Sequence, residues 1–299
     1  MKKIFVIFIL GIFGIGLFCW GEHHQKIIND NANTSMVLLK AVGKLKITAR
    51  ADNETYQAYF HVPIAFKEQV PLAIEIDCPQ LVDYRFIHLT PPNMIVSARV
   101  KRGLTNLNWT AWVLVKDNSY ADHPEFVPLT ALDELTGEEK KWLQPTDCAQ
   151  LDAPIVREKA ALVRNNTTNL IELADSTASY CSSIPPDFPH SPGAFDAVYA
   201  LKFGNACTGR AHAGAALLRA NGVPARSILN LPPTGSSNYI DMHWFVDYLV
   251  PGYGWVNMET FMGINFYNPQ NAVVVYVSNP GDEFPVFCPP RCLLAHIRT

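Results

Sequence analysis

The spacing of the apolar residues changes near the middle of the chain, and this change limits the folds that the chain can adopt. Between about Lys44 and Val115, apolar and polar residues alternate, and β-branched and aromatic residues are frequent. Alternation of this kind predicts β-strands, whose side chains point in turn to two faces. Six strands are predicted, separated by Pro, Asn, Asp or Gly: KLKITAR, YQAYFHV, LAIEI, YRFIH, NMIVSARV and LNWTAWVLV. Strands this dense, without helices between them, predict a β-sandwich or a small barrel.

After this region the apolar residues mostly recur at helical spacing. The stretch from Leu129 to Leu143 is predicted to be one helix that ends before Pro145. A strongly helical run extends from Cys207 to Ala220, and Gly222 ends it. Three more helices are expected between these two, in IVREKAALV, TNLIELADSTASY and residues 194–201.

Beyond Pro224 the chain returns to strand spacing. Four strands are expected, in ARSILNL, MHWFVDYLV, GWVNMET and AVVVYVS. A turn over residues 251–254, with one proline and two glycines, joins the second and third into a hairpin. The predicted fold class is therefore α+β, with a β-sandwich-like N-terminal domain over residues 35–127 and an α+β domain over residues 128–299.

The first 21 residues resemble an export signal. Lys2 and Lys3 precede an uncharged apolar run from Ile4 to Phe18, which is short for a membrane span. Small residues at Cys19 and Gly21 fit cleavage after Gly21, so we expect a signal peptide over residues 1–21 and a secreted or periplasmic protein. Lipidation of Cys19 or an uncleaved anchor is the alternative, and either would attach the N-terminus to a membrane.

Export would place the cysteines in an oxidising compartment, where structural thiols tend to pair. Six cysteines remain after the signal segment, and a catalytic thiol would leave five, so at most two pairs form. The expected pairs are Cys148–Cys181 and Cys288–Cys292, although spacing alone does not determine the connectivity.

The charge pattern argues against nucleic-acid binding, which needs clustered cationic side chains. The net charge is −3, and no run of Lys or Arg follows the two N-terminal lysines. A metal site formed by Cys207, His212 and His243 is not expected either. Five residues along a helix correspond to a rotation of about 500°, so Cys207 and His212 do not share a face. We expect neither a metal nor a cofactor.

Cys207 lies at the predicted start of a helix, shortly after Gly204 and Asn205. The unpaired N–H groups and the positive dipole end of a helix stabilise a thiolate, and they can also bind the oxyanion of a tetrahedral intermediate. Taken alone, a cysteine at this position is more often a buried residue that only packs.

His243 opens one strand of the predicted hairpin and Glu259 ends the next, so the hairpin folds the two residues toward each other. An acid beside an imidazole fixes its tautomer and stabilises the imidazolium. Singly, His243 could be a strand histidine bonded to a carbonyl, and Glu259 an exposed charge. The joint pattern with Cys207 favours a catalytic triad.

Two blocks of sequence resemble the transglutaminase-like superfamily, whose core is a rearranged papain-like fold, and specifically its secreted bacterial type. The first block reads CTGRAHAGAALLRANGVPAR and opens with the cysteine. The second reads HWFVDYLVPGYGWVNMET, with the acid four residues after tryptophan and 16 after the histidine. The resemblance implies that Cys207 is the nucleophile, His243 its base and Glu259 the acid.

Several positions depart from the family pattern. Glu259 replaces the usual Asp, so its carboxylate reaches about one methylene further. Asn205 stands where glycine is common, two residues before the cysteine, and is a candidate oxyanion donor. Trp244 comes one position early, with Phe245 in its usual place, so the indole is expected on the opposite strand face. Trp244 and Arg226 are candidates for substrate contact, although a structural role at the helix end is the favoured interpretation of Arg226.

The resemblance favours an exported cysteine-dependent amide hydrolase, a protease or amidase, acting on a peptide or protein amide through a thioester acyl-enzyme. One alternative is a transglutaminase, which transfers the acyl group of a protein glutamine to an amine. Thr208 follows the cysteine where animal cross-linking enzymes carry tryptophan, and no amine channel is apparent. The other alternative is a non-catalytic binding protein that retains the fold, which would need neither Cys207 nor His243.

Overall fold

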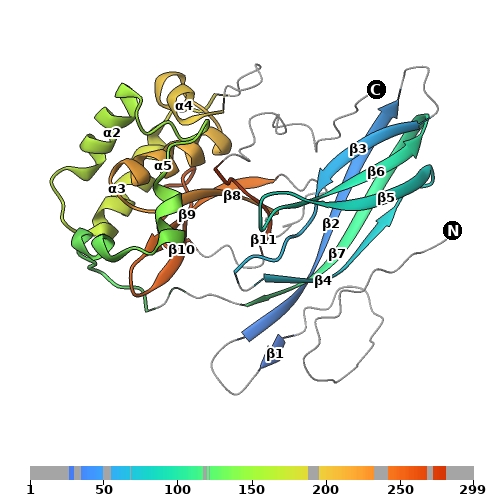
Figure 1. Cartoon of the computed structure of the whole chain (residues 1–299), viewed down its shortest axis with the longest axis horizontal. Coiled ribbons are helices and arrows are strands. Elements are labelled where there is room, and N and C mark those ends of the chain that lie inside the picture. The colour runs from blue at the N-terminus through green and yellow to red at the C-terminus, as the bar shows by residue number, and fades with distance from the viewer. Residues whose placement is uncertain are drawn as a thin grey trace.

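The structure is a computed structural model that describes residues 27–29, 35–49, 55–67, 69–116, 120, 122–187, 195–231, 242–267 and 272–280. The expected signal peptide and the Cys288–Cys292 pair lie outside these residues. A strand-rich N-terminal part lies beside a part in which helices cover a separate sheet (Figure 1). No helix among the described residues is long and apolar enough to cross a membrane.

The N-terminal part consists of two antiparallel sheets, with strand orders β1-β2-β7-β4 and β3-β6-β5. The strands are β1 Ile27–Asn29, β2 Ser35–Ala49, β3 Thr55–His61, β4 Gln69–Asp77, β5 Leu81–His88, β6 Met94–Lys101 and β7 Gly103–Lys116. All six strands predicted in this region are present. The pairing of β2 with β7 is longer than expected, from Met36↔Lys116 to Ala49↔Gly103.

Alternate side chains of both sheets enter one apolar core, as expected for a β-sandwich. The buried positions on β7 and β6 are Leu107, Trp109, Ala111, Val113, Val96, Ala98 and Val100. The close packing requires a glycine on β2, because a Cβ at Gly43 would lie 2.2 Å from the indole of Trp109.

The C-terminal part is α+β, as predicted. Its helices are α1 Gly137–Lys140, α2 Pro154–Arg164, α3 Leu170–Ser183, α4 Ala197–Phe203 and α5 Cys207–Ala220, with 3-10 turns η1 Leu129–Glu134 and η2 Lys141–Leu143. Its sheet has the order β10-β9-β8-β11, formed by β8 Ala225–Leu231, β9 His243–Val250, β10 Gly254–Met258 and β11 Val273–Val277. All neighbours in this sheet are antiparallel.

The single helix predicted over Leu129–Leu143 is wrong, because the structure divides this stretch into η1, α1 and η2. Thr136 has an extended backbone and caps a new helix, with its hydroxyl accepting from the Glu139 N–H and the Glu139 carboxylate accepting from the Thr136 N–H. This capping box starts a second helix where the apolar pattern had indicated a continuous one.

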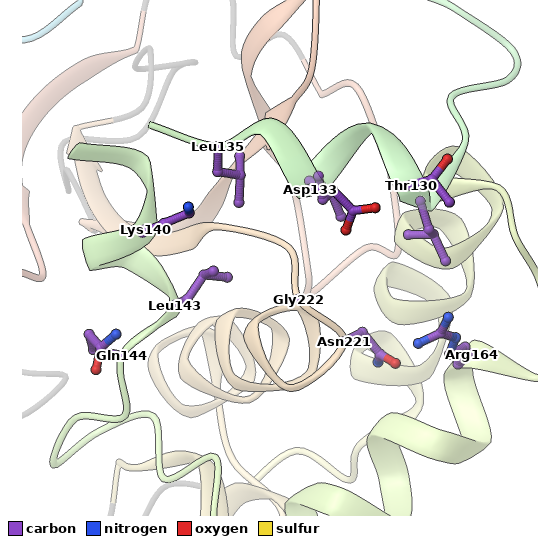
Figure 2. Close-up of a pocket in the computed structure, with 11 residues that line it drawn as sticks. Thr130, Asp133, Leu135, Lys140, Leu143, Gln144, Arg164, Asn221 and Gly222 are labelled. Atoms are coloured by element: carbon purple, nitrogen blue, oxygen red, sulfur yellow. The ribbon is translucent and has the colours of Figure 1, made fainter. Parts of the chain in front are cut away.

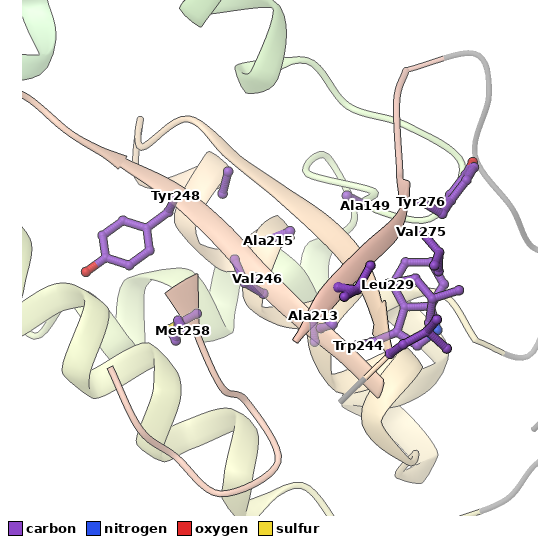
Figure 3. Packing of buried hydrophobic residues seen from close by; sticks show 14 of the residues in the cluster. Ala149, Ala213, Ala215, Leu229, Trp244, Val246, Tyr248, Met258, Val275 and Tyr276 are labelled. Carbon is purple, nitrogen blue, oxygen red and sulfur yellow. The ribbon is translucent and has the colours of Figure 1, made fainter. Parts of the chain in front are cut away.

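Helix α5 is the centre of this domain. Every residue from Thr208 to Arg219 is buried, since α2, α3 and α4 cover the helix on one side and β8 and β9 on the other. Small side chains let the helix approach the sheet: a Cβ at Gly214 would lie 3.0 Å from Thr260 and 3.1 Å from Val246. Figure 3 shows Ala213 and Ala215 of α5 close to the sheet residues. The first residue of α5 is thereby held beside the start of β9.

Side-chain amides of the sandwich cover the edge strand β11. Gln69 Nε2 donates to Val274 O at 2.8 Å and its Oε1 accepts from Val274 N at 2.7 Å. Asn93 repeats this arrangement on Val277, at 2.6 and 2.8 Å. The two amides replace the main-chain partners that a further strand would supply, and so protect a sheet edge that would otherwise be open to aggregation.

Cys181 is a free thiol that is completely buried on α3, so the predicted disulfide with Cys148 is wrong. Burial raises the pKa of Cys181 to about 12, against a smaller lowering by Arg210. The thiol packs as an apolar residue, which is the commoner role of a buried cysteine.

Candidate active site

Cys207 is the first residue of α5, and the loop before it is fixed against Pro185. The Asn205 N–H donates to Pro185 O at 2.9 Å. Gly204 has φ +94°, and a Cβ there would lie 2.5 Å from the same carbonyl oxygen, so a larger residue would push the loop away. The N-cap, Ala206, offers no side chain to the helix N–H groups. Of these groups, the Gly209 N–H donates to Asn205 Oδ1, whereas the N–H groups of Cys207 and Thr208 precede the first acceptor that the helix itself supplies.

Hydrogen bonds around Cys207 favour its thiolate. Burial raises the pKa of the thiol, but the hydrogen bond and charge of His243 outweigh it, together with the main-chain N–H of Trp244 and the side chain of Thr208. The pKa of Cys207 is therefore lower than that of an ordinary thiol. The residue is only partly buried, so a reacting group can reach it.

His243 lies between Cys207 and Glu259, as the hairpin predicted. Its Nε2 is 2.8 Å from Glu259 Oε1, which leaves Nδ1 for the thiol. Burial lowers the pKa of His243, but the hydrogen bonds that its imidazolium donates to the thiolate and the carboxylate, and the charges of these two groups, raise it to about 9. The group is thus arranged as a thiolate–imidazolium pair with a supporting carboxylate.

The register of the hairpin shows why a glutamate suits this position. Met258 pairs with Val246, so the register places Glu259 opposite Phe245 and diagonal to His243. Diagonal neighbours on an antiparallel sheet are about 7–8 Å apart, which long side chains can bridge. The extra methylene of Glu259 covers this diagonal.

The Glu259 carboxylate is completely buried and is held in place by the turn that follows it. Oε1 accepts from the Phe261 N–H at 2.9 Å, and Oε2 accepts from the Met262 N–H. The main chain of Glu259 is paired with Ile264 at 2.8 and 3.0 Å. The turn thus fixes both the backbone and the carboxylate of the acid.

Asn205 is completely buried, and its Oδ1 accepts from the Gly209 N–H at 3.2 Å. The Asn205 side chain therefore caps an N–H group in the first turn of α5. Its role as an oxyanion donor stays a prediction. The structure does not support substrate contact by Trp244. Its indole is 1% exposed and packs against His212 and Tyr276, on the strand face opposite His243, so only its main-chain N–H reaches the cysteine.

Arg226 has the structural role that was favoured for it. Its guanidinium is bonded to the buried Asp247, with Nε–Oδ2 at 2.9 Å and Nη2–Oδ2 at 2.7 Å. It also lies over the rings of Phe66, Trp142 and Trp255, at 4.7, 5.0 and 4.0 Å from their centroids. These contacts occupy the guanidinium, so the predicted substrate contact is not supported.

A pocket of about 540 Å³ lies at the other end of α5, away from the cysteine (Figure 2). Asn221 and Gly222, which follow the helix, line it together with residues of η1, α1 and η2. It is not lined by Cys207, His243 or Glu259. Among the described residues, no group of three or more His, Cys, Asp or Glu is placed to hold a metal ion.

A family model and one solved structure are similar to this chain in fold. Residues 156–260 match the model of the transglutaminase-like superfamily. No curated protein matches the sequence. A structure from Cytophaga hutchinsonii named a "putative cysteine protease" is similar over 82% of each chain, with 16% identity and a TM-score of 0.64. The periplasmic domain of TgpA from Pseudomonas aeruginosa, bound to ethylmercury, aligns over 75% of this chain and 90% of its own, with 16% identity and a TM-score of 0.37. The match assigns residues 156–260, within the C-terminal α+β domain, to the transglutaminase-like superfamily.

Proposed function

We propose that the protein is an exported cysteine-dependent amide hydrolase, a protease or amidase, in which Cys207, His243 and Glu259 form the catalytic triad. The observation that carries the proposal is the hydrogen-bonded series from Cys207 through His243 to Glu259 at the start of α5. The opposite pKa shifts of the thiol and the imidazole support a thiolate that is already formed before substrate binds.

In the proposed reaction, the Cys207 thiolate attacks the amide carbonyl carbon and forms a tetrahedral intermediate. The N–H groups of Cys207 and Thr208, which have no acceptor within the helix, face the negative oxygen. The His243 imidazolium gives its proton to the leaving amine, and a thioester remains. Neutral His243 then takes a proton from water, the hydroxide attacks the thioester, and the acid product leaves with the thiolate restored.

Hydrolysis is preferred to amine transfer on two grounds. First, Thr208 follows the nucleophile at the position where animal cross-linking enzymes carry tryptophan. In the structure its side chain forms a hydrogen bond with the Cys207 thiol. The similar structure from Cytophaga hutchinsonii carries a protease name. Export is proposed from the composition of residues 1–21.

Alkylation of the purified protein with iodoacetamide across pH tests the triad. We expect rapid labelling of Cys207 near pH 6, and slower labelling in His243→Ala and Glu259→Ala. Labelling that follows an ordinary thiol pKa of about 8.5 would refute the triad.

The acyl acceptor is tested separately, with dye-labelled casein and with a glutaminyl dipeptide in the presence of a primary amine. Release of peptides, or of acid and ammonia, without incorporation of the amine supports a hydrolase. Amine incorporation as the main product would instead make the protein a transglutaminase. Cys207→Ala, which removes the nucleophile, is the control in both assays.

A further inference from the structure

Arg210 lies one helical turn after Cys207 and is 4% exposed, although it carries a charge. Its donors reach main-chain carbonyls from three separate segments. Nε donates to Asn205 O at 3.1 Å, Nη1 to Phe261 O at 3.2 Å, and Nη2 to Ile184 O. Its guanidinium also lies 4.4 Å from the centroid of the Phe261 ring.

Each of these segments adjoins the candidate catalytic group. Asn205 precedes Cys207 by two residues, Phe261 follows Glu259 by two, and Ile184 precedes the Pro185 carbonyl that anchors the loop before α5. A rigid fork with five N–H donors can hold three carbonyls at once, which a single ammonium cannot do with the same geometry. Arg210 therefore joins the nucleophile loop to the turn that fixes the acid.

The positive charge of Arg210 also balances the net charge of the candidate catalytic group. The charged forms of Cys207, His243 and Glu259 sum to −1, because two of them are anionic and one is cationic. Arg210 interacts electrostatically with Cys207 and with the buried Glu259, and also with Cys181 on α3, whose raised pKa keeps its thiol neutral. With Arg210 included, the buried group is neutral overall, which lowers the cost of keeping it out of water.

We propose that Arg210 is a positioning residue of the reaction, which holds the Asn205, Ile184 and Phe261 carbonyls around the site and balances the net negative charge of Cys207, His243 and Glu259. The inference rests on the proposed function. It assigns to Arg210 a part in the reaction that the family pattern around Cys207 and His243 does not include.

The test compares iodoacetamide labelling of Cys207 against pH in Arg210→Met, Arg210→Lys and the unchanged protein. Loss of an opposite charge disfavours the thiolate, so on the acid side of the midpoint Arg210→Met is expected to label about tenfold more slowly. Arg210→Lys retains the charge and should keep the midpoint. Its kcat for peptide hydrolysis is expected to fall roughly tenfold to a hundredfold with little change in KM, because the carbonyls are no longer held together.

Arg219→Met is the matched control. Arg219 is also 4% exposed on α5 and donates to the Ala225 and Gln144 carbonyls at 2.7 and 3.0 Å, but it lies about 18 Å along the helix from Cys207. Its loss should reduce stability and leave the Cys207 midpoint unchanged.

A folded Arg210→Met variant with the midpoint of the unchanged protein would overturn the proposal. If Arg210→Met does not fold, unchanged kcat in Arg210→Lys would overturn it. Failure of the proposed function looks different, because the unchanged protein would itself then label as an ordinary thiol.

Discussion

At the scale of single residues, the candidate site depends on the length of the Glu259 side chain, which must reach His243. Glu259 is diagonal to His243 across the hairpin, and its carboxylate accepts three hydrogen bonds, from the imidazole and from two main-chain N–H groups. The sequence showed that an acid follows the strand, but it could not show the diagonal. That offset depends on β10 ending at Met258 while β9 continues to pair with β8.

The glutamate is therefore expected to be better here than the aspartate usual in the family. Glu259→Gln retains the length and loses the charge, and we expect kcat/KM to fall by roughly 10²- to 10⁴-fold because the imidazolium loses its anionic partner. Glu259→Asp retains the charge, but its kcat/KM should also fall, because the shorter side chain does not reach the diagonal position of His243. Steady-state hydrolysis measures both. Glu172→Gln, an exposed acid on α3, is the control. An Asp variant as active as the unchanged protein would contradict the argument from reach.

The pH dependence follows from the two pKa shifts. The proposed reaction requires Cys207 to be deprotonated and His243 to be protonated. The acid limb of kcat/KM should lie below the ordinary thiol value, and the alkaline limb near pH 9, where His243 loses its proton. Because the pKa of His243 is raised above its ordinary 6.5, its contribution to stability is present below 6.5 and is lost as pH rises through about 9. Glu259→Gln should move the alkaline limb to lower pH. A profile in which activity rises continuously beyond pH 9 would exclude the ion pair.

At the scale of elements, sequence patterns predicted the helix bounds that depend on residues close together in sequence. The bounds of α5, Cys207–Ala220, agree with the prediction, because its helical residues and the end signal Gly222, two residues after it, are all local in sequence. The helix predicted from Leu129 failed because a capping box competes with apolar spacing. Arg210 was missed as a site residue, since its role depends on carbonyls of segments distant in sequence, Ile184 and Phe261.

The first turn of α5 offers a test of this local packing. A Cβ at Gly209 would lie 2.3–2.7 Å from the buried side chain of Asn205. Gly209→Ala is therefore expected to displace the loop before Cys207, with a loss of about 1–3 kcal/mol in stability and a fall in kcat. Gly137→Ala in α1 meets no atom within 4 Å and should be neutral or slightly stabilising. Urea unfolding and hydrolysis rates measure both variants. Equal effects of the two substitutions would show that the contact with Asn205 is unimportant.

At the scale of the whole molecule, the sandwich and the C-terminal α+β domain meet in a polar cluster that sequence patterns did not predict. The loop between β3 and β4 carries Phe66 and Lys67 into the C-terminal domain. Lys67 Nζ pairs with Asp247 and donates to Trp255 O at 3.2 Å, and Phe66 lies against Arg226. Arg226 and Asp247 are neighbours on β8 and β9, so the cluster connects the sandwich to the strand that begins with His243.

This interface predicts different costs for its two ion pairs. Asp247 has no exposed side-chain surface, whereas Lys67 is 24% exposed and Arg226 11%. Asp247→Asn would leave Arg226 charged among three aromatic rings without a carboxylate, and we expect the free energy of unfolding to fall by about 3–5 kcal/mol. Lys67→Met removes a pair that is partly open to water, so its cost should be about 1 kcal/mol or less. Urea unfolding of the two variants and of the double variant measures each cost and their coupling. If Lys67→Met costs as much as Asp247→Asn, the stability of the interface comes from the contact between domains and not from the buried Arg226–Asp247 pair.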